Sequence, residues 1–359
     1  MSAKKPIRIL VVEDTPVCRE LLVNIFHTVP DFQVVGVARN GLEGVRLAKR
    51  LQPDLITMDV HMPEMDGYEA TQHIMSEIPR PIIMISASVQ KNEHHLLFTA
   101  LQSGALAVLD KPTINDPPEV RQHLIDQIRN LAEVKVVRRW QTKPGLNGTR
   151  RLPEPPSPKI DSGGVNIIAI AASTGGPGAL VEVLKHLPPS FPVPILLVQH
   201  VTIGFGEGFV RWLNLQLPLE VRLARHADEP KPGEILVAPD DQHMFINNMG
   251  LIRLSQDPPI HGVRPAAEYL FQSVAEVYGK TAVGIILTGM GRDGASGLLA
   301  MHQAGAYTIA QDKASSVVFG MPAVAIELGA ASEVLPIHRI GTTLKQYIQS
   351  RLPHGHHTN

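Results

Sequence analysis

The chain has 359 residues, of which 44% are hydrophobic and 19% charged, so it is long enough for two globular domains that each bury a hydrophobic core. Its 33 Lys and Arg residues nearly balance its 34 Asp and Glu residues, and the formal net charge of -1 excludes a global field that would draw the chain to nucleic acid or to an acidic membrane. Its one cysteine, Cys18, excludes an intrachain disulfide and a cysteine-based zinc cluster, as is typical of a reducing compartment.

The N-terminal segment has none of the features of a membrane signal. Residues 1–16 hold two lysines and then an apolar run that Glu13 and Asp14 interrupt. This run is too short for a signal peptide or for a membrane-spanning helix. We therefore expect a cytoplasmic protein that does not insert into a membrane.

Between Ile7 and Leu131, short runs rich in β-branched residues alternate with stretches of helical character. The predicted strands read IRILVV, FQVVGVA, DLITMD, PIIMISA and ALAVLD, and the predicted helices read CRELLVNIF and GLEGVRLAKRL. Strands that alternate with helices in this way predict a parallel sheet with helices on both faces. Residues 1–131 are therefore predicted to form one α/β domain.

A segment rich in proline, glycine and serine separates this domain from a second α/β pattern. Residues 142–164 have few large apolar side chains and predict a linker, whose bounds we set at residues 132–164. The second pattern includes the predicted strands VNIIAIAAS, PVPILLVQH and AVGIILTG, and it predicts a parallel-sheet domain over residues 165–351. Residues 352–359 are predicted to be a disordered tail with incidental histidines.

Acidic residues follow two predicted strands of the first domain. Glu13 and Asp14 come directly after IRILVV, and Asp59 ends the run DLITMD. Because the carboxyl ends of parallel strands meet at one edge of a sheet, we expect these carboxylates to converge. Gathered carboxylates repel one another unless a cation lies among them, and Mg²⁺ binds a few carboxylates together with water and phosphate oxygens. The residues therefore predict a phosphate acceptor with its metal ion.

Two further polar residues follow predicted strands of the same domain. Ser86 closes the run PIIMIS, and Lys111 follows ALAVLD. A hydroxyl and an ammonium at this edge could hold phosphoryl oxygens. Each polar residue taken alone has a structural explanation, since acidic residues after strands often cap helices and Lys-Pro is a loop signal.

The first domain resembles the response regulator receiver domain over residues 7–131, because it carries that family's residues in order: Glu13-Asp14, Asp59 within MDVHMPEMDG, Ser86-Ala87 and Lys111-Pro112. The resemblance implies a flavodoxin-like doubly wound fold in which a histidine kinase supplies the phosphoryl group to Asp59. It further implies that Glu13, Asp14 and Asp59 hold Mg²⁺, that Ser86 is the switch hydroxyl, and that Lys111 contacts the phosphoryl group. Receivers usually carry an aromatic residue where Val108 stands, so the aromatic part of the switch is in question.

The second domain opens with a strand and a glycine-rich turn, Ser173-Thr174-Gly175-Gly176-Pro177. A serine in a sharp strand-to-helix turn exposes its hydroxyl beside unpaired backbone N–H groups, which could stabilise an oxyanion. Such a serine can act as a nucleophile. Ser173 or Thr174 could equally cap the following helix, and the turn alone does not decide between the two.

A histidine and an aspartate follow two later strands of this domain. His200 ends PILLVQH, and Asp293 lies in the turn after AVGIILTG. If these strands neighbour the one before Ser173, the three side chains meet at one edge. A hydroxyl, an imidazole that takes its proton and a carboxylate that orients the imidazole are what acyl transfer requires. Each residue alone also fits a structural role, and the order Ser, His, Asp is not that of the α/β hydrolases.

Residues 165 to about 337 resemble the catalytic domain of the chemotaxis-type protein-glutamate methylesterases, a family that joins this domain to a receiver; the matching stretches are ASTGGP, QH, PGEILVAPDDQHM, GIILTGMGRDG, AGAYTIAQD and FGMP. The resemblance implies that Ser173 is the nucleophile, His200 the base and Asp293 the residue that orients it. Thr174 and Met290 match positions that help to form the oxyanion site. It also implies that the enzyme hydrolyses glutamyl methyl esters on chemoreceptors, that it deamidates receptor glutamines, and that the esterase reaction needs no cofactor.

Two segments depart from the family's usual sequence. Residues 201–206 read VTIGFG in place of Met-Pro-Pro-Gly-Phe-Thr, and residues 263–268 read VRPAAE in place of His-Arg-Pro-Ser-Val-Asp. Both segments are expected to border the cleft. Receptor specificity or the docking of the receiver is therefore expected to differ from better-known members.

Three other functions have to be compared with the residues of the second domain. A DNA-binding response regulator would need a basic recognition helix, but the domain has no clustered Lys/Arg face, so we expect no nucleic acid partner. A nucleotide-binding domain is suggested by Gly279-Lys280-Thr281, but no GxGxxG occurs, and Val274 stands where a phosphate-binding loop has its first glycine. A catalytically silent signalling scaffold stays open, although the presence of serine, histidine and aspartate argues against it.

Overall fold

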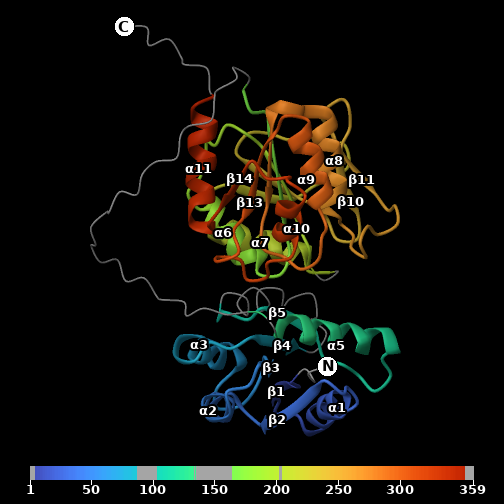
Figure 1. The fold of residues 1–359 in the computed structure, drawn as a ribbon, viewed down its shortest axis with the longest axis vertical. Helices are drawn as coiled ribbons and strands as arrows, with labels where there is room; N and C mark the ends of the chain where they lie inside the picture. The colour runs from blue at the N-terminus through green and yellow to red at the C-terminus, as the bar shows by residue number, and fades with distance from the viewer. Residues whose placement is uncertain (1–4, 87–102, 133, 135–163, 202–203, 352–359) are drawn as a thin grey trace, which may run out of the picture.

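The computed structural model describes residues 5–86, 103–132, 134, 164–201 and 204–351. These residues form two α/β units, and each unit is built on its own parallel sheet (Figure 1). The α/β class that the sequence predicts for both domains is therefore confirmed.

The first sheet has the strand order β2-β1-β3-β4-β5, which is that of a flavodoxin-like doubly wound fold. Its elements are the strands β1 (Ile7–Val12), β2 (Phe32–Ala38), β3 (Leu55–Asp59), β4 (Ile82–Ser86) and β5 (Ala107–Asp110) and the helices α1 (Pro16–His27), α2 (Gly41–Leu51), α3 (Gly67–Glu77) and α5 (Pro118–Ala132). Alternate side chains of β1 enter opposite cores: Leu10 packs with residues of α2 and α3, and Ile9 packs with residues of α1 and α5. Burial on both faces explains why these strands are almost wholly apolar.

The second sheet is also parallel, with the order β14-β13-β12-β6-β7-β9-β8. Its strands are β6 (Ile167–Ala172), β7 (Ile195–Gln199), β8 (Glu220–Leu223), β9 (Glu234–Val237), β12 (Ala282–Ile286), β13 (Tyr307–Gln311) and β14 (Glu333–Leu335). The two-stranded antiparallel hairpin β10 (His243–Ile246) and β11 (Ile252–Ser255) stands apart from this sheet.

Helices cover both faces of the second sheet. Residues of α6 (Gly176–Leu184), α7 (Gly206–Gln216) and α11 (Ile337–Gln349) share one core, and residues of α8 (Ala267–Tyr278), α9 (Ala295–Gln303) and α10 (Met321–Glu327) share the other; the short 3-10 helix η1 (Gly279–Thr281) follows α8. The chain leaves β6 towards β7 on one side and returns through β12 on the other. A crevice at the carboxyl ends of the strands is expected at such a reversal, and the predicted active-site residues follow these three strands.

Two predictions fall largely outside the described part of the chain. Most of the predicted linker, residues 135–163, and the predicted tail, residues 352–359, are not described, so both stay predictions. Among the helices that are described, none has a stretch long and apolar enough to cross a bilayer.

Candidate active site and candidate phosphorylation site

Ser173 directly follows β6, in the turn that leads into α6. Its backbone N–H donates to the carbonyl of Thr288 (3.0 Å), and its carbonyl accepts from the N–H of Gly176 (2.8 Å). The N-cap residue of α6 is Gly175, with φ of 77°, and no side chain caps this helix. A Cβ on Gly175 would lie 2.5 Å from Val317, so both the backbone conformation and the space require glycine. The serine is therefore not a helix cap, which removes the alternative that the sequence left open.

His200 directly follows β7, the strand beside β6. Ala172 pairs with Gln199 in the sheet, and the N–H of His200 donates to the carbonyl of Ala172 (3.0 Å). Ser173 and His200 therefore follow paired positions of adjacent strands. The buried side-chain amide of Gln199 joins them, because its Nε2 donates to the carbonyls of both Ser173 and His200 at 2.9 Å. The sequence did not point to Gln199 as part of this site, although it precedes His200 in the QH motif.

Asp293 is 3% exposed and lies against His200. Its Oδ2 is 2.9 Å from Nε2 of the imidazole and accepts the N–H of Ala267 (2.6 Å), and its Oδ1 accepts the N–H of Glu268 (3.1 Å), both in the first turn of α8. A helix N-terminus stabilises negative charge, and α8 has no side chain of its own as a cap. The carboxylate is thus fixed in orientation, with one oxygen on the imidazole.

The structure joins the predicted histidine and aspartate but does not yet join the serine to them. Within the described part of the chain, the Ser173 hydroxyl makes no hydrogen bond. Because Nε2 of His200 faces Asp293, Nδ1 is the ring nitrogen left for the serine proton. Catalytic hydrogen bonds are often long or unformed before substrate binds.

The two residues predicted for the oxyanion site lie beside this turn. The carbonyl of Thr174 accepts from the hydroxyl of Thr288 (2.9 Å), which ties the turn of Ser173 to the segment after β12. Gly289, next to Met290, leaves only enough room for a hydrogen, because a Cβ there would lie 2.8 Å from Cβ of Ser173. Met290 thus belongs to the segment that borders the serine.

The receiver-like unit lies against this end of the second unit. Met290, Val317 and Val318 pack onto the receiver core that includes residues of β5 and α5. Figure 1 shows the same arrangement, with β5 and α5 facing the end of the second unit near α6, α7 and α10. A cavity of about 320 Å³ remains between the two units, and it is lined in part by Leu106 of the receiver and by Val134, two residues after the end of α5. The receiver therefore contacts the segment of Met290 and the segment of Val317, which both border the turn of Ser173.

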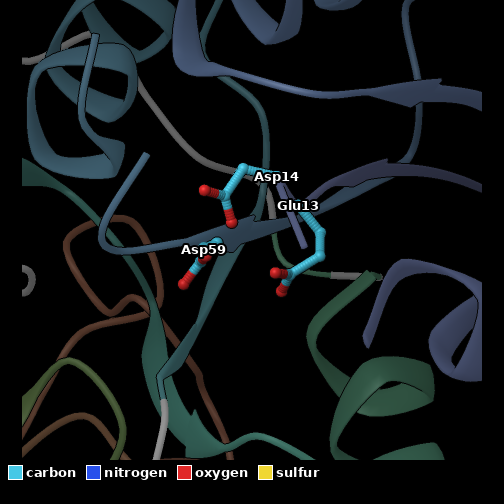
Figure 2. Close-up of side chains that lie close together, drawn as sticks. All are labelled: Glu13, Asp14 and Asp59. Atoms are coloured by element: carbon cyan, nitrogen blue, oxygen red, sulfur yellow. The ribbon is translucent and has the colours of Figure 1, made fainter. Parts of the chain in front are cut away.

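The predicted acidic residues of the receiver converge as expected. Figure 2 shows Glu13, Asp14 and Asp59 around one point, and one oxygen from each lies within 4.8 Å of the others. The ammonium of Lys111 is 2.8 Å from Oδ2 of Asp59 and 3.0 Å from Oε1 of Glu13. Ser86 ends β4 beside them, and its carbonyl accepts the N–H of Lys111 (2.7 Å).

This pocket holds more negative than positive charge, which favours the binding of a cation. Burial, and then the charge of Asp59, raises the pKa of the Glu13 carboxyl above its usual value. Burial alone would lower the pKa of Lys111, but its contacts with Asp59 and Glu13 prevail and raise it. Oε2 of Glu13 is buried and has no hydrogen-bond partner among the described residues. Three carboxylates with one oxygen unsatisfied suit a hard divalent cation.

Arg19 holds the acidic turn, and Val108 occupies the position where receivers usually carry an aromatic residue. Arg19, which the sequence reasoning missed, donates from Nη1 to the carbonyls of Glu13 (2.9 Å) and Asp14 (2.8 Å) and fixes the acidic turn. Val108 is half-buried and packs onto the core formed with α2 and α3. Because valine has no aromatic ring, this position does not supply a ring that could move between exposed and buried orientations.

The two segments that depart from the family's usual sequence are held by neighbouring aspartates after β9. Asp240 accepts the N–H groups of Gly204 (2.8 Å) and Gly206 (3.1 Å). The guanidinium of Arg264 donates to Asp241 from Nε (2.8 Å) and from Nη2 (2.7 Å). The Asp240-Asp241 pair therefore anchors one residue or more of each segment.

Comparison with known proteins agrees with this architecture. Residues 168–344 match the family model of the CheB methylesterase, and residues 9–125 match that of the response regulator receiver domain. A protein-glutamate methylesterase/protein-glutamine glutaminase of Syntrophus aciditrophicus is 47% identical over 97% of this chain and 100% of its own length, and one of Myxococcus xanthus is 44% identical over 94% and 96%.

A solved structure covers the second unit. The catalytic domain of the CheB methylesterase of Thermotoga maritima is 38% identical, with a TM-score of 0.50, over 51% of this chain and 98% of that one. The chain therefore belongs to the family of receiver-linked protein-glutamate methylesterases/protein-glutamine glutaminases. Both resemblances drawn from the sequence are confirmed.

Proposed function

We propose that this chain hydrolyses the methyl esters of glutamates on chemoreceptors through Ser173, His200 and Asp293, and that phosphorylation of Asp59 controls the reaction. The observation that carries the proposal is the orientation of the imidazole by Asp293, beside a serine that follows the adjacent strand. A chemoreceptor as substrate and a histidine kinase as phosphodonor follow from family membership. A cytoplasmic location fits both partners.

In the proposed reaction, Nδ1 of His200 takes the hydroxyl proton of Ser173 as the serine oxygen attacks the ester carbonyl. Backbone N–H groups near Thr174 and Met290 stabilise the oxyanion. The C–O bond to the methoxy group breaks, and His200 returns the proton so that methanol leaves. Water, deprotonated by His200, then hydrolyses the acyl-enzyme and leaves a glutamate on the receptor.

The same steps account for deamidation of receptor glutamines. An amide carbonyl accepts the serine oxygen as an ester does, and the proton from His200 makes ammonia the leaving group. Asp293 stabilises the imidazolium in both reactions, because its carboxylate is held on Nε2. Neither reaction calls for a cofactor in the catalytic domain.

Regulation is proposed to act through the contact between the units. The receiver lies on the segments of Met290 and Val317, so it would compete with a receptor helix for this face. Glu13, Asp14 and Asp59 would hold Mg²⁺, which offsets their charge and that of an incoming phosphate. With Asp59 phosphorylated, Lys111 would turn from the carboxylate to a phosphoryl oxygen and Ser86 would donate to another. The new contacts would favour a receiver that leaves the cleft.

The experiment compares release of methanol from methylated receptor by the unaltered chain, Ser173→Ala and Asp59→Asn, each with and without a small phosphodonor. Ser350→Ala, an exposed serine at the end of α11, serves as a matched control. We expect no turnover from Ser173→Ala, normal turnover from the control, and stimulation by phosphodonor only where Asp59 is present. Turnover by Ser173→Ala would contradict the serine mechanism, and stimulation of Asp59→Asn would contradict the regulatory one.

A further inference from the structure

His243 is a completely buried histidine that the proposed reaction does not use. It opens strand β10, whose hairpin packs against α8. Nδ1 of the ring accepts the backbone N–H of Ala266 at 3.1 Å, and Nε2 lies 3.2 Å from the carbonyl of Pro258. Since one partner is a donor and the other an acceptor, the ring is neutral and carries its proton on Nε2.

The hydrogen-bond partner of Nδ1 lies at the N-terminus of α8, the helix whose first backbone N–H groups donate to Asp293. Ala266 is the N-cap residue of α8, and its side chain cannot cap the helix. The next two N–H groups, of Ala267 and Glu268, are those that donate to the Asp293 carboxylate. The position of Ala266 therefore decides where these two donors point.

Further contacts hold the ring of His243 and the neighbouring loop in place, so that the ring is a rigid support. The phenol ring of Tyr269 stacks on His243, with centroids 4.6 Å apart and planes at 13°. The guanidinium of Arg264 donates to the carbonyls of Gln256 (2.9 Å) and Asp257 (3.0 Å) as well as to Asp241. The imidazole of His243 thus joins the two ends of the loop between Pro258 and Ala266. The guanidinium of Arg264 fixes the residues that precede this loop.

We propose that His243 is a positioning residue of the esterase. Its neutral ring bridges Pro258 and Ala266, fixes the first turn of α8, and through the two N–H groups of that turn holds Asp293 against His200. The inference rests on the proposed function, because it gives Asp293 the task of orienting the base. It also assigns a role to the histidine of the motif APDDQHM, which the sequence reasoning did not interpret.

The test compares three variants of the full-length chain on methylated receptor. His243→Phe keeps an aromatic ring for Tyr269 but removes both nitrogens, and His243→Asn restores an acceptor near the position of Nδ1. Ser273→Ala is the matched control, because Ser273 also joins β10 to α8, through the N–H of Ile246 (3.1 Å), but does not touch Ala266.

We expect His243→Phe to lower kcat by about tenfold to a hundredfold with KM unchanged, because a misplaced Asp293 no longer orients the base. His243→Asn should recover part of this loss, and Ser273→Ala should keep kcat while lowering the melting temperature. An unchanged kcat in folded His243→Phe, or an equal loss in Ser273→Ala, would overturn the proposal.

A second measurement needs no variant enzyme to be active. In the full-length chain labelled with ¹⁵N-histidine, the signal that disappears in either His243 variant should show a protonated Nε2 and an unprotonated, hydrogen-bonded Nδ1 at neutral pH. A proton on Nδ1 would overturn the proposal. Failure of the proposed function itself is recognised separately, since Asp293→Asn would then keep full kcat whatever His243 does.

Discussion

Asp293 serves two partners at once, and this makes its charge more important than its shape. One oxygen lies on the imidazole of His200, while the carboxylate as a whole takes the place of a cap at the N-terminus of α8. An asparagine would keep much of the shape but would remove the charge that stabilises the imidazolium.

Asp293→Asn should therefore lower kcat by about 10³ to 10⁴, with little effect on KM. It should also lower the free energy of unfolding by about 0.5 to 2 kcal/mol, because the helix loses its anionic partner. Methanol release and urea unfolding measure the two effects. A variant with normal kcat would show that His200 does not depend on this carboxylate.

At the scale of elements, the C-terminal helix α11 is fastened to the sheet by an aromatic pair. Tyr307 of β13 stacks on Tyr347 of α11 with ring centroids 4.0 Å apart, and the guanidinium of Arg351 lies 3.9 Å from the centre of the Tyr347 ring. Burial, followed by the charge of Glu333, raises the pKa of the Tyr307 phenol well above its usual value.

This shift predicts the pH dependence of stability. A raised pKa means that the folded protein keeps a phenol proton that the unfolded chain loses above about pH 10. The contribution of Tyr307 is therefore fully present below that pH and is lost as the pH rises further. In urea unfolding, Tyr307→Phe should lose less stability than the unaltered chain between about pH 9 and pH 11. Parallel pH curves for the two proteins would contradict the assignment.

Sequence patterns predict the strands of this chain better than the hydrogen bonds that connect the elements to one another. The buried strands β1, β3, β6 and β7 are apolar runs followed by polar residues. Their existence could therefore be predicted, as could the sheet edge at which Asp59 lies in the first unit and the one at which His200 lies in the second. The contacts that complete the site could not. Gln199, His243 and the first turn of α8 act through backbone groups far away in the chain, and no local pattern encodes such pairings.

For the whole molecule, the contact between the two units is the basis of regulation. Val134 is half-buried, packs with the receiver core and borders the cavity between the units. A charge introduced at Val134 would weaken the contact between the two units, because an unpaired charge is costly to bury. Leu42, which is 55% exposed on α2, offers a matched position away from the contact.

Val134→Asp should therefore raise methanol release severalfold without phosphodonor and reduce the further gain when phosphodonor is added. Leu42→Asp should behave like the unaltered chain in both conditions. If Val134→Asp folds normally and stays fully dependent on phosphodonor, the contact seen in the structure does not restrain the enzyme.

The most direct measurement is to trap the covalent intermediate. The full-length chain with phosphodonor is mixed with a methyl-esterified receptor peptide, quenched in acid during turnover, digested and analysed by mass spectrometry. We expect an ester between the peptide's glutamyl group and Ser173, with one methanol lost for each adduct formed. An adduct on any other residue of the turning-over enzyme would contradict it.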